Sequence, residues 1–242
     1  MADRVALVTG ANKGIGLETS RQLGKLGIMV LMGARDEAAG RRAAESLSKE
    51  GVRVKTIRLD VSDAGTIEAA AAAIRREHGR LDILVNNAGV AMQGQDGPPT
   101  KVTMTALRQT FEINFFGLIA VTQAMLPLLR ESAAGRIVNL TSILGSAAEH
   151  ADPNSPIHGY GMVAYNTSKA AVNLYTIQLA LELKGTKIKV NAAHPGWVKT
   201  DMGGPGAQLE LADGAKTGVA LATLPDDGPT GGYYHMGVHM RW

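Results

Sequence analysis

The sequence predicts an α/β fold: a doubly wound parallel sheet of about seven strands, flanked by helices, in a single domain. Short β-branched runs alternate with alanine-rich stretches of helical spacing along all 242 residues. Such alternation gives right-handed crossovers and parallel pairing. No Pro/Gly-rich linker divides the chain, no repeat is present, and 45% of residues are hydrophobic, enough for a large core. We therefore expect residues 1–242 to form one domain.

The first half of the chain predicts four strands and three helices. Apolar runs that stop at turn residues predict strands at 5–8, 28–32, 52–59 and 81–85. Helical spacing predicts helices at 15–26, 36–50 and 63–79. Asp36 and Asp63 are expected to cap the second and third of these helices, and glycines to end all three.

The second half continues the pattern after a Gly/Pro/Gln loop at 89–102. Helices are expected at about 103–131 and 163–183, with a further short helix after a Gly-rich loop at 199–213. Strands are expected at 136–140, 187–193 and 232–236.

Composition and charge exclude several classes of protein. Lys plus Arg exceed Asp plus Glu by only 25 to 22, and no basic run is longer than two residues, which argues against nucleic-acid binding. Zero cysteines exclude disulfides, thiolate metal sites and a cysteine nucleophile. No apolar run approaches the length of a membrane span, and the start lacks a secretory signal, so we expect a cytoplasmic protein without a membrane partner.

A glycine-rich turn, Gly10-x-x-x-Gly14-x-Gly16, follows the first predicted strand. Glycines let the backbone approach a pyrophosphate, and the next helix supplies amide donors at its N-terminus. The same glycines also fit an ordinary tight turn. Their place between the first strand and the first helix favours dinucleotide binding.

Further polar residues suggest chemistry. Tyr165 and Lys169 are four apart in a predicted helix, so phenol and ammonium share a face, and a nearby cation lowers a tyrosine pKa. The pair alone also fits an ordinary helix surface. Ser142 follows the fifth strand, and parallel sheets bind ligands at the carboxyl ends of their strands. Asn114 interrupts an apolar helix face between Phe111 and Phe115.

In order and spacing these residues resemble the short-chain dehydrogenase/reductase family, in the subtype of this chain's length. The resemblance covers nearly the whole chain, and it rests on the glycine turn at 10–16, Asp60-Val61, Asn86–Gly89, Asn114, Ser142, Tyr165, Lys169 and Pro195-Gly196. The run at 9–16 and the ending Gly228–Gly232 look more like the carbonyl-reductase branch. The resemblance implies a Rossmann-type fold and reversible hydride transfer between a nicotinamide cofactor and a ketone or aldehyde.

The resemblance also implies roles for the four catalytic residues. Tyr165 is expected to be the general acid in reduction and the base in oxidation. Lys169 is expected to lower the pKa of Tyr165 and to bind the nicotinamide ribose. Ser142 is expected to stabilise charge on the substrate oxygen, and Asn114 to hold a water in a proton relay behind Lys169.

For the cofactor, the resemblance implies contacts from four segments together with Tyr165 and Lys169, and it leaves Asn86 to brace the sheet. The expected contacts are Gly10, Asn12, Lys13, Gly14, Ile15, Gly16, Arg35, Asp60, Val61, Asn87, Ala88, Gly89, Pro195, Gly196, Val198 and Thr200. Asp60 and Val61 are expected at the adenine.

The end of the second strand bears on the choice of nicotinamide. Asp36 lies 20 residues beyond Gly16, where NAD enzymes place an acid for the ribose 2′-hydroxyl. Asp36 also fits a helix N-cap, whereas Ala34 takes the strand-end position. Arg35 and Lys13 can instead pair with a 2′-phosphate. We expect NADPH/NADP+ rather than NADH.

Loops at 89–102, 143–162 and 197–213 are expected to wall the substrate pocket. Apolar side chains predominate there, which predicts a small hydrophobic carbonyl substrate: Ile143, Leu144, Tyr160, Met162, Trp197 and Met202. Ser142 and Tyr165 are 23 apart, which is longer than the family pattern. The extra residues, at 149–159, could wall the pocket or cover a helix face, so the family's tetramer is not a safe expectation.

Two alternative functions remain open on the sequence alone. A β-ketoacyl-carrier reductase would want a basic patch near the pocket mouth, for which Arg108 and Arg130 are the candidates. A non-catalytic NADP(H)-binding regulator would be expected to lose one of the four catalytic residues. His235 and His239 have a spacing that fits metal ligands, but no carboxylate lies nearby, so we expect no metal.

Overall fold

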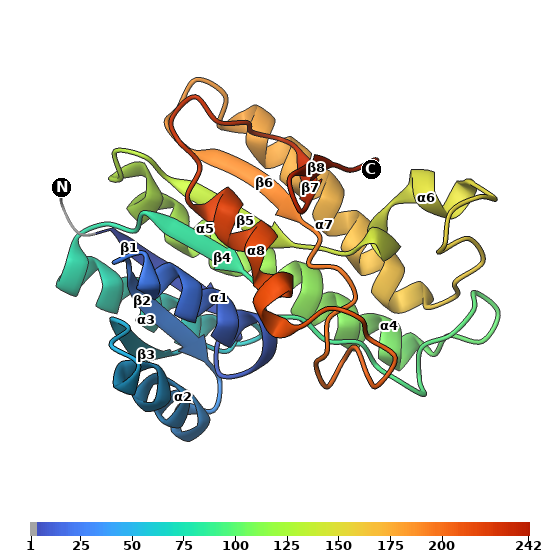
Figure 1. Ribbon diagram of the computed structural model, residues 1–242, viewed down its shortest axis with the longest axis horizontal. Helices are drawn as coiled ribbons and strands as arrows, with labels where there is room; N and C mark the ends of the chain where they lie inside the picture. The colour runs from blue at the N-terminus through green and yellow to red at the C-terminus, as the bar shows by residue number, and fades with distance from the viewer. Residues whose placement is uncertain (1–3) are drawn as a thin grey trace.

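The computed structural model describes residues 4–242, and its eight strands form one sheet in the order β3-β2-β1-β4-β5-β6-β7-β8 (Figure 1). The strands are Val5–Thr9 (β1), Met29–Ala34 (β2), Val54–Arg58 (β3), Ile83–Asn86 (β4), Arg136–Leu140 (β5), Lys189–Ala193 (β6), Tyr233–His235 (β7) and Val238–His239 (β8). All neighbours pair in parallel except β7 and β8. The strand order reverses direction between β1 and β4, and doubly wound sheets bind ligands at such a point, beyond the carboxyl ends of the strands.

Helices cover both faces of the sheet. They are Gly14–Lys25 (α1), Glu37–Lys49 (α2), Ala64–His78 (α3), Met104–Phe111 (α4), Gly117–Arg130 (α5), Ala147–Ala151 (α6), Val163–Glu182 (α7) and Leu211–Ala222 (α8). One hydrophobic core lies under α1, α2 and α8, and the other under α3, α5 and α7. The predicted caps are confirmed, because Asp36 accepts from the Ala39 N–H and Asp63 from the Gly65 N–H.

Side chains along β1 point alternately to the two faces of the sheet, which explains why the strands are unbroken apolar runs in the sequence. Val5 and Leu7 belong to the core under α3, α5 and α7, whereas Ala6 and Val8 belong to the core on the other face. Because both faces are covered, every side chain of the strand must be apolar or hydrogen-bonded.

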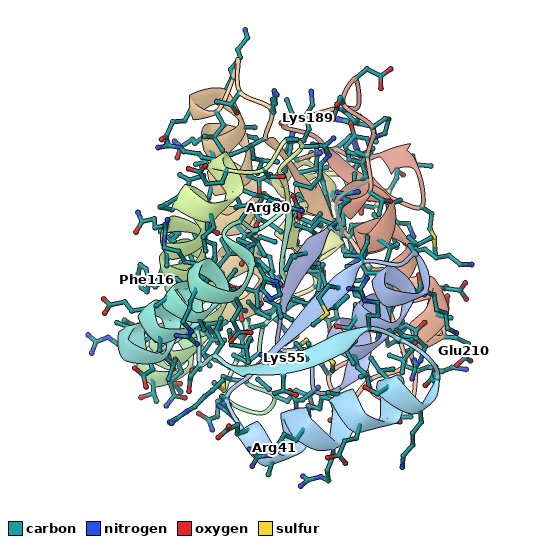
Figure 2. The ribbon with its side chains drawn as sticks, turned by 90° about the vertical axis from the view of Figure 1, so that its left-hand side faces the viewer. Arg41, Lys55, Arg80, Phe116, Lys189 and Glu210 are labelled. Carbon is teal, nitrogen blue, oxygen red and sulfur yellow. The ribbon has the colours of Figure 1, made fainter. Side chains whose placement is uncertain are left out.

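The long helix expected at 103–131 has three parts: α4, a π-helical stretch over Glu112–Phe116, and α5. Together Met104–Arg130 have the length and apolar composition of a membrane-spanning helix, although no apolar run of that length occurs in the sequence. A helix packed on a core has the same features. Met125 is fully buried against the sheet, while Phe116 lies on the outer surface (Figure 2).

The last predicted strand, 232–236, is present as β7, and it forms a hairpin with the unpredicted β8, which raises the strand count from about seven to eight. Met236 and Gly237 form its two-residue turn with φ of 48° and 81°. Positive φ at both central positions is the type I′ geometry that fits the twist of two antiparallel strands. Methionine is a poor signal for such a turn, so the sequence did not reveal it.

The segment between Ser142 and Tyr165 contains α6, which was not predicted. Ser146 caps α6 by accepting from the Glu149 N–H. The far end of the chain holds α6 in place, because Arg241 pairs with Glu149 at 2.8 Å and with Asp152 at 2.9 Å.

Candidate active site

The glycine-rich turn after β1 is held against the end of β4. Asn87 Nδ2 donates to the Thr9 carbonyl at 2.7 Å, and the Thr9 hydroxyl accepts from the backbone N–H groups of Asn87 and Ala88. A Cβ at Gly16 would lie 2.4 Å from Asn87 Nδ2, so only glycine fits. Gly10 has a φ of 62°, a left-handed conformation that also favours glycine. The sequence did not indicate that Thr9 and Asn87 lock the turn.

The N-terminus of α1 faces this turn without a side-chain cap. Lys13 is the N-cap residue and makes no capping hydrogen bond, and Asn12 and Ile15 are partly buried beside it. A helix N-terminus of this kind is suited to phosphate groups. Gly14 lies near the loop after β6, since a Cβ there would be 3.6 Å from Thr200 Cγ2. Lys13 Nζ pairs with Asp201 of that loop at 2.6 Å.

Arg35 and Asp60 come close together beyond β2 and β3. Arg35 is exposed, and its charge helps to lower the pKa of Asp60. Burial acts against that shift, but hydrogen bonds from the Ser62 hydroxyl and N–H outweigh it. Val61 is buried against the start of α5. Asp36, the alternative contact, is occupied as the N-cap of α2.

Tyr165, Ser142 and Lys169 meet at the carboxyl end of the sheet. The Ser142 hydroxyl lies near the Tyr165 phenol, close enough to act on its pKa, and it accepts from the Leu144 N–H at 3.2 Å. Lys169 is buried, donates to the Leu140 carbonyl at 3.0 Å, and lies 5.7 Å from the centroid of the Tyr165 ring. The fold thus brings Ser142 to Tyr165 and Lys169, which lie 23 and 27 residues further along the chain.

The electrostatics of the cluster differ from our expectation. Burial raises the pKa of Tyr165 to about 12, although the Ser142 hydroxyl acts in the opposite direction. Burial also lowers the pKa of Lys169 to about 8. The expected lowering of the Tyr165 pKa by Lys169 is not seen in the protein alone, where desolvation is the largest effect on the phenol.

Asn114 lies in the π-helical stretch and is completely buried. Its Nδ2 donates to Ser168 Oγ at 3.0 Å, and Ser168 Oγ donates to the Tyr165 carbonyl at 2.7 Å. A Cβ at Gly89 would lie 3.3 Å from Asn114 Oδ1 and 3.5 Å from Lys169 Nζ. Gly89 therefore leaves room for both groups, and Ser168 is a linking residue that sequence analysis missed.

A ladder of buried polar side chains connects the helices to the strands below the cluster. Asn86 Nδ2 donates to Thr122 Oγ1 and to Asn139 Oδ1, and Asn139 Nδ2 donates to Thr176 Oγ1, all at 2.9 Å. The ladder crosses α5, β4, β5 and α7. This confirms that Asn86 braces the sheet.

Asp96, in the loop after β4, caps the helix that carries Tyr165. Its carboxylate accepts from the N–H groups of Gly97, Ala164 and Tyr165 at 2.8–2.9 Å. The N-cap residue of α7, Met162, makes no such bond. Sequence analysis missed Asp96, because a cap from a distant loop leaves no local pattern.

The six residues expected to line the pocket lie on two of the three expected loops, at 143–162 and 197–213. Tyr160, Trp197 and Met202 are 51%, 55% and 41% exposed, while Ile143, Leu144 and Met162 are partly buried. The third loop, 89–102, is joined to the loop at 197–213, since Gln93 Nε2 donates to the Met202 carbonyl at 3.0 Å. Exposed apolar side chains of this size suit an apolar ligand.

The loop after β6 contains Pro195 and Gly196, which follow His194. Gly196 has a φ of 87°, and a Cβ there would lie 2.3 Å from Leu209 Cδ1. Val198 is buried and pairs with Leu209 in a single bridge.

His235 and His239 do not share a site. In the hairpin, His239 is paired with Tyr234 and contacts that ring, whereas His235 lies against the His194 ring. The two side chains therefore lie on opposite faces of the hairpin. Within residues 4–242, no three His, Cys, Asp or Glu side chains gather in a way that could hold a metal ion.

The chain shares this architecture with known proteins. Bovine carbonyl reductase [NADPH] 1 is 35% identical, and the alignment covers 98% of both chains. That alignment runs over 276 positions, more than the 242 residues of this chain, so the bovine protein has segments that this chain lacks.

Two solved structures also match. The NADPH-bound carbonyl reductase from chicken fatty liver has a TM-score of 0.86 at 29% identity and 100% coverage of both chains. Salutaridine reductase from Papaver somniferum has a TM-score of 0.82 at 33% identity, covering 96% of this chain and 99% of its own. The sequence profile of the short chain dehydrogenase family matches residues 4–208. The chain belongs to the short chain dehydrogenase family.

Proposed function

We propose that this protein is an NADPH-dependent carbonyl reductase that converts ketones or aldehydes to alcohols by reversible hydride transfer. The observation that carries this proposal is the contact between the Ser142 and Tyr165 hydroxyls beside Lys169, at the carboxyl edge of a sheet whose first turn is rich in glycine. Two hydroxyl donors that converge on one point suit a substrate oxygen.

The pKa of Tyr165, near 12, keeps its phenol protonated at neutral pH. In reduction, Tyr165 donates this proton to the substrate oxygen while the Ser142 hydroxyl hydrogen-bonds to the same oxygen. Bound NADPH supplies the hydride. Lys169, whose amine is close to Asn114 across Gly89, returns a proton toward the Tyr165 site. Asn114 would hold the water of a proton relay behind Lys169.

The residues present fit the cofactor. The uncapped N-terminus of α1 can take the pyrophosphate, and glycine at positions 10 and 14, both with positive φ, keeps side chains out of the turn. Asp60, Val61 and Asn87–Gly89 would lie along the adenosine. Arg35 and Lys13 would hold the 2′-phosphate, and the buried Ala34 offers no acid to a 2′-hydroxyl. Pro195, Gly196, Val198 and Thr200 would hold the nicotinamide.

The test is turnover of a panel of ketones and aldehydes with NADPH, followed by nicotinamide absorbance. We expect oxidation of NADPH with hydrophobic carbonyl compounds, given the exposed apolar side chains around the site. Tight NADPH binding without turnover of any carbonyl would instead support the non-catalytic regulator.

An acyl-carrier thioester in the panel tests the other alternative, a β-ketoacyl-carrier reductase. Arg130, one of its two candidate contacts, ends α5 beside Leu128, whose carbonyl accepts from Leu81 at the amino end of the sheet, away from Ser142.

The choice of cofactor has its own test. The double change Ala34→Asp with Arg35→Ala adds repulsion toward a 2′-phosphate and removes attraction. We expect it to cut the NADPH-to-NADH ratio of kcat/KM by about a hundred-fold or more, since a charged hydrogen bond contributes about 1.5–3 kcal/mol. Arg35→Ala alone should lose less, because Lys13 remains. A wild type that prefers NADH would contradict the proposal.

The absence of cysteine fits a reducing compartment, so we also propose a cytoplasmic location, which cell fractionation can test.

A further inference from the structure

His194 is a buried residue that has no part in the mechanism proposed above. It follows β6 directly, and its backbone is fixed on both sides by β7. The His194 N–H donates to the Tyr234 carbonyl at 2.8 Å, and the His194 carbonyl accepts from His235 Nδ1 at 2.9 Å. The position of the imidazole is therefore determined by the sheet.

The imidazole bridges two loops of the active site. Nδ1 of His194 accepts from the backbone N–H of Ile143 at 3.3 Å and from the backbone N–H of Gly196 at 3.3 Å. Ile143 follows Ser142 in the loop after β5. Gly196 belongs to the loop after β6, where the proposed function places the nicotinamide. One ring nitrogen thus joins the loop that would hold the substrate oxygen to the loop that would hold the hydride donor.

The protonation state of His194 suits this contact. Nδ1 accepts hydrogen bonds only when it carries no proton, so the neutral ring must be protonated on Nε2. Burial, reinforced by the neighbouring His235, lowers the pKa of His194 to about 3, which keeps the ring neutral at any working pH. The His235 ring packs against it with centroids 4.7 Å apart and restricts its rotation.

We propose that His194 is a positioning residue that sets the separation between the Ser142 hydroxyl and the nicotinamide loop. This inference rests on the proposed carbonyl reduction, because that reaction needs the substrate carbon close to the hydride donor. The Ser142 loop is a single 3₁₀ turn, Ile143–Gly145, and the His194 bond holds its first N–H. Loss of that bond frees the residue next to Ser142 without removing any group that touches the substrate.

Two substitutions separate positioning from packing. His194→Leu keeps an apolar body but removes the acceptor. His194→Asn places an amide oxygen close to the position of Nδ1 and can accept both N–H groups, whereas His194→Gln carries its oxygen one bond further. We expect the leucine variant to lose about 10- to 100-fold in kcat and equally in kcat/KM, because misplacement by about 1 Å has such an effect. The asparagine variant should recover most of the loss and the glutamine variant little.

A second measurement does not depend on turnover. Amide hydrogen exchange of Ile143 and Gly196, followed by NMR, should be faster in the leucine variant than in the wild type, and nearly unchanged in the asparagine variant. Equal kcat in the leucine variant and the wild type, equal losses in leucine and asparagine variants, or unchanged exchange at both amides would overturn the inference. If the wild type reduces no carbonyl compound, the proposed function fails, whereas the exchange comparison still decides whether His194 joins the two loops.

Discussion

Both ends of the sheet bury charged groups, but they do so in different ways. At the amino end, the Asp82 carboxylate accepts from the Val5 N–H, the Ser132 hydroxyl and Arg80, at 2.6–3.2 Å. Arg136, 1% exposed, donates to three backbone carbonyls and to Asp226. At the carboxyl end, the buried Lys169 amine has one hydrogen-bond partner among residues 4–242, the Leu140 carbonyl.

The contrast separates buried charges that hold the fold together from buried groups that remain available for binding or catalysis. A buried charge whose donors or acceptors are all used holds elements together. A buried group with spare hydrogen-bonding capacity can still bind a ligand, and burial shifts its pKa. Lys169 and Tyr165 show such shifts, and in the same region Asp96 and His194 have their bonds filled by backbone N–H groups.

The largest effect should come from Tyr165→Phe, which removes the proton donor and keeps the packing of the ring. We expect kcat to fall by about 10³-fold, within the usual range for a general acid. NADPH affinity should stay within a few-fold of wild type, and the free energy of unfolding should change little. Single-turnover kinetics and NADPH titration check this. Retention of substantial reductase activity would remove Tyr165 from the mechanism.

Next in size is the effect of Lys169→Met on stability without cofactor. Burial lowers the pKa of Lys169 from 10.5 to about 8. Between those two values the unfolded chain binds more protons than the folded chain, so wild-type stability rises with pH in that window. Below it, the buried charge costs about 3 kcal/mol. The variant should therefore be more stable at pH 7, and its advantage should shrink above pH 8.

Urea unfolding of wild type and Lys169→Met across that pH window measures the difference. Tyr165 is present in both proteins, so its own titration cancels. A constant difference would show that Lys169 is not destabilised by burial.

Arg136→Met tests the amino end. It should lower the free energy of unfolding by about 2–4 kcal/mol, because the carbonyls of Leu224, Gly135 and Lys187 lose a buried partner. The kcat of the folded protein should not change. The matched control is Arg41→Met on α2, an exposed arginine that pairs with Glu37 one turn earlier in the helix (Figure 2); this change should cost less than about 0.5 kcal/mol. If Arg136→Met and Arg41→Met lowered the free energy of unfolding equally, the buried arginine at the amino end of the sheet would have no special structural role.

The smallest expected effect concerns Asp96, which lies at the carboxyl end of the sheet and has its bonds filled by backbone N–H groups. Asp96→Ala removes the cap of α7 and should cost about 1 kcal/mol of stability. We also expect kcat to fall several-fold, because the Tyr165 N–H loses its partner, and Asp96→Asn should restore part of both. The exposed Asp227→Ala, in the loop after α8, serves as a control for a loop carboxylate that caps no helix. A loss of stability with unchanged kcat would make Asp96 a cap and nothing more.

Sequence patterns predicted the parts of the molecule that depend on interactions between residues close together in the chain. The strands and most helices agree with the structure within about two residues, since apolar runs and caps such as Asp36 and Asp63 are short-range signals. The position of Ser142 at the carboxyl edge followed from the rule that parallel strands end at one edge, whereas the family resemblance implied that Tyr165 and Lys169 lie beside it. The residues that hold this cluster have no short-range signal.

Asp96 lies 69 residues before Tyr165, and His194 lies 51 after Ile143. Their contacts exist only once the chain has folded. The pKa of Tyr165 could not be predicted for a related reason, because it depends on burial by neighbours from several elements. The hairpin at Met236-Gly237 was missed because its turn uses a residue that rarely adopts positive φ.

The ladder of Asn86 and Asn139 also bears on how the strands find their register. Apolar strands such as β4 and β5 would pair almost as well after a slip of two residues, since valines and isoleucines are nearly interchangeable. Asn86 lies opposite Asn139, and a slip would break the hydrogen bond between these two buried amides. The pair therefore penalises mispaired alternatives during folding. Asn87 follows β4 and Ser142 follows β5. The pairing of Asn86 with Asn139 therefore also fixes where these two loops leave the carboxyl edge of the sheet, relative to each other.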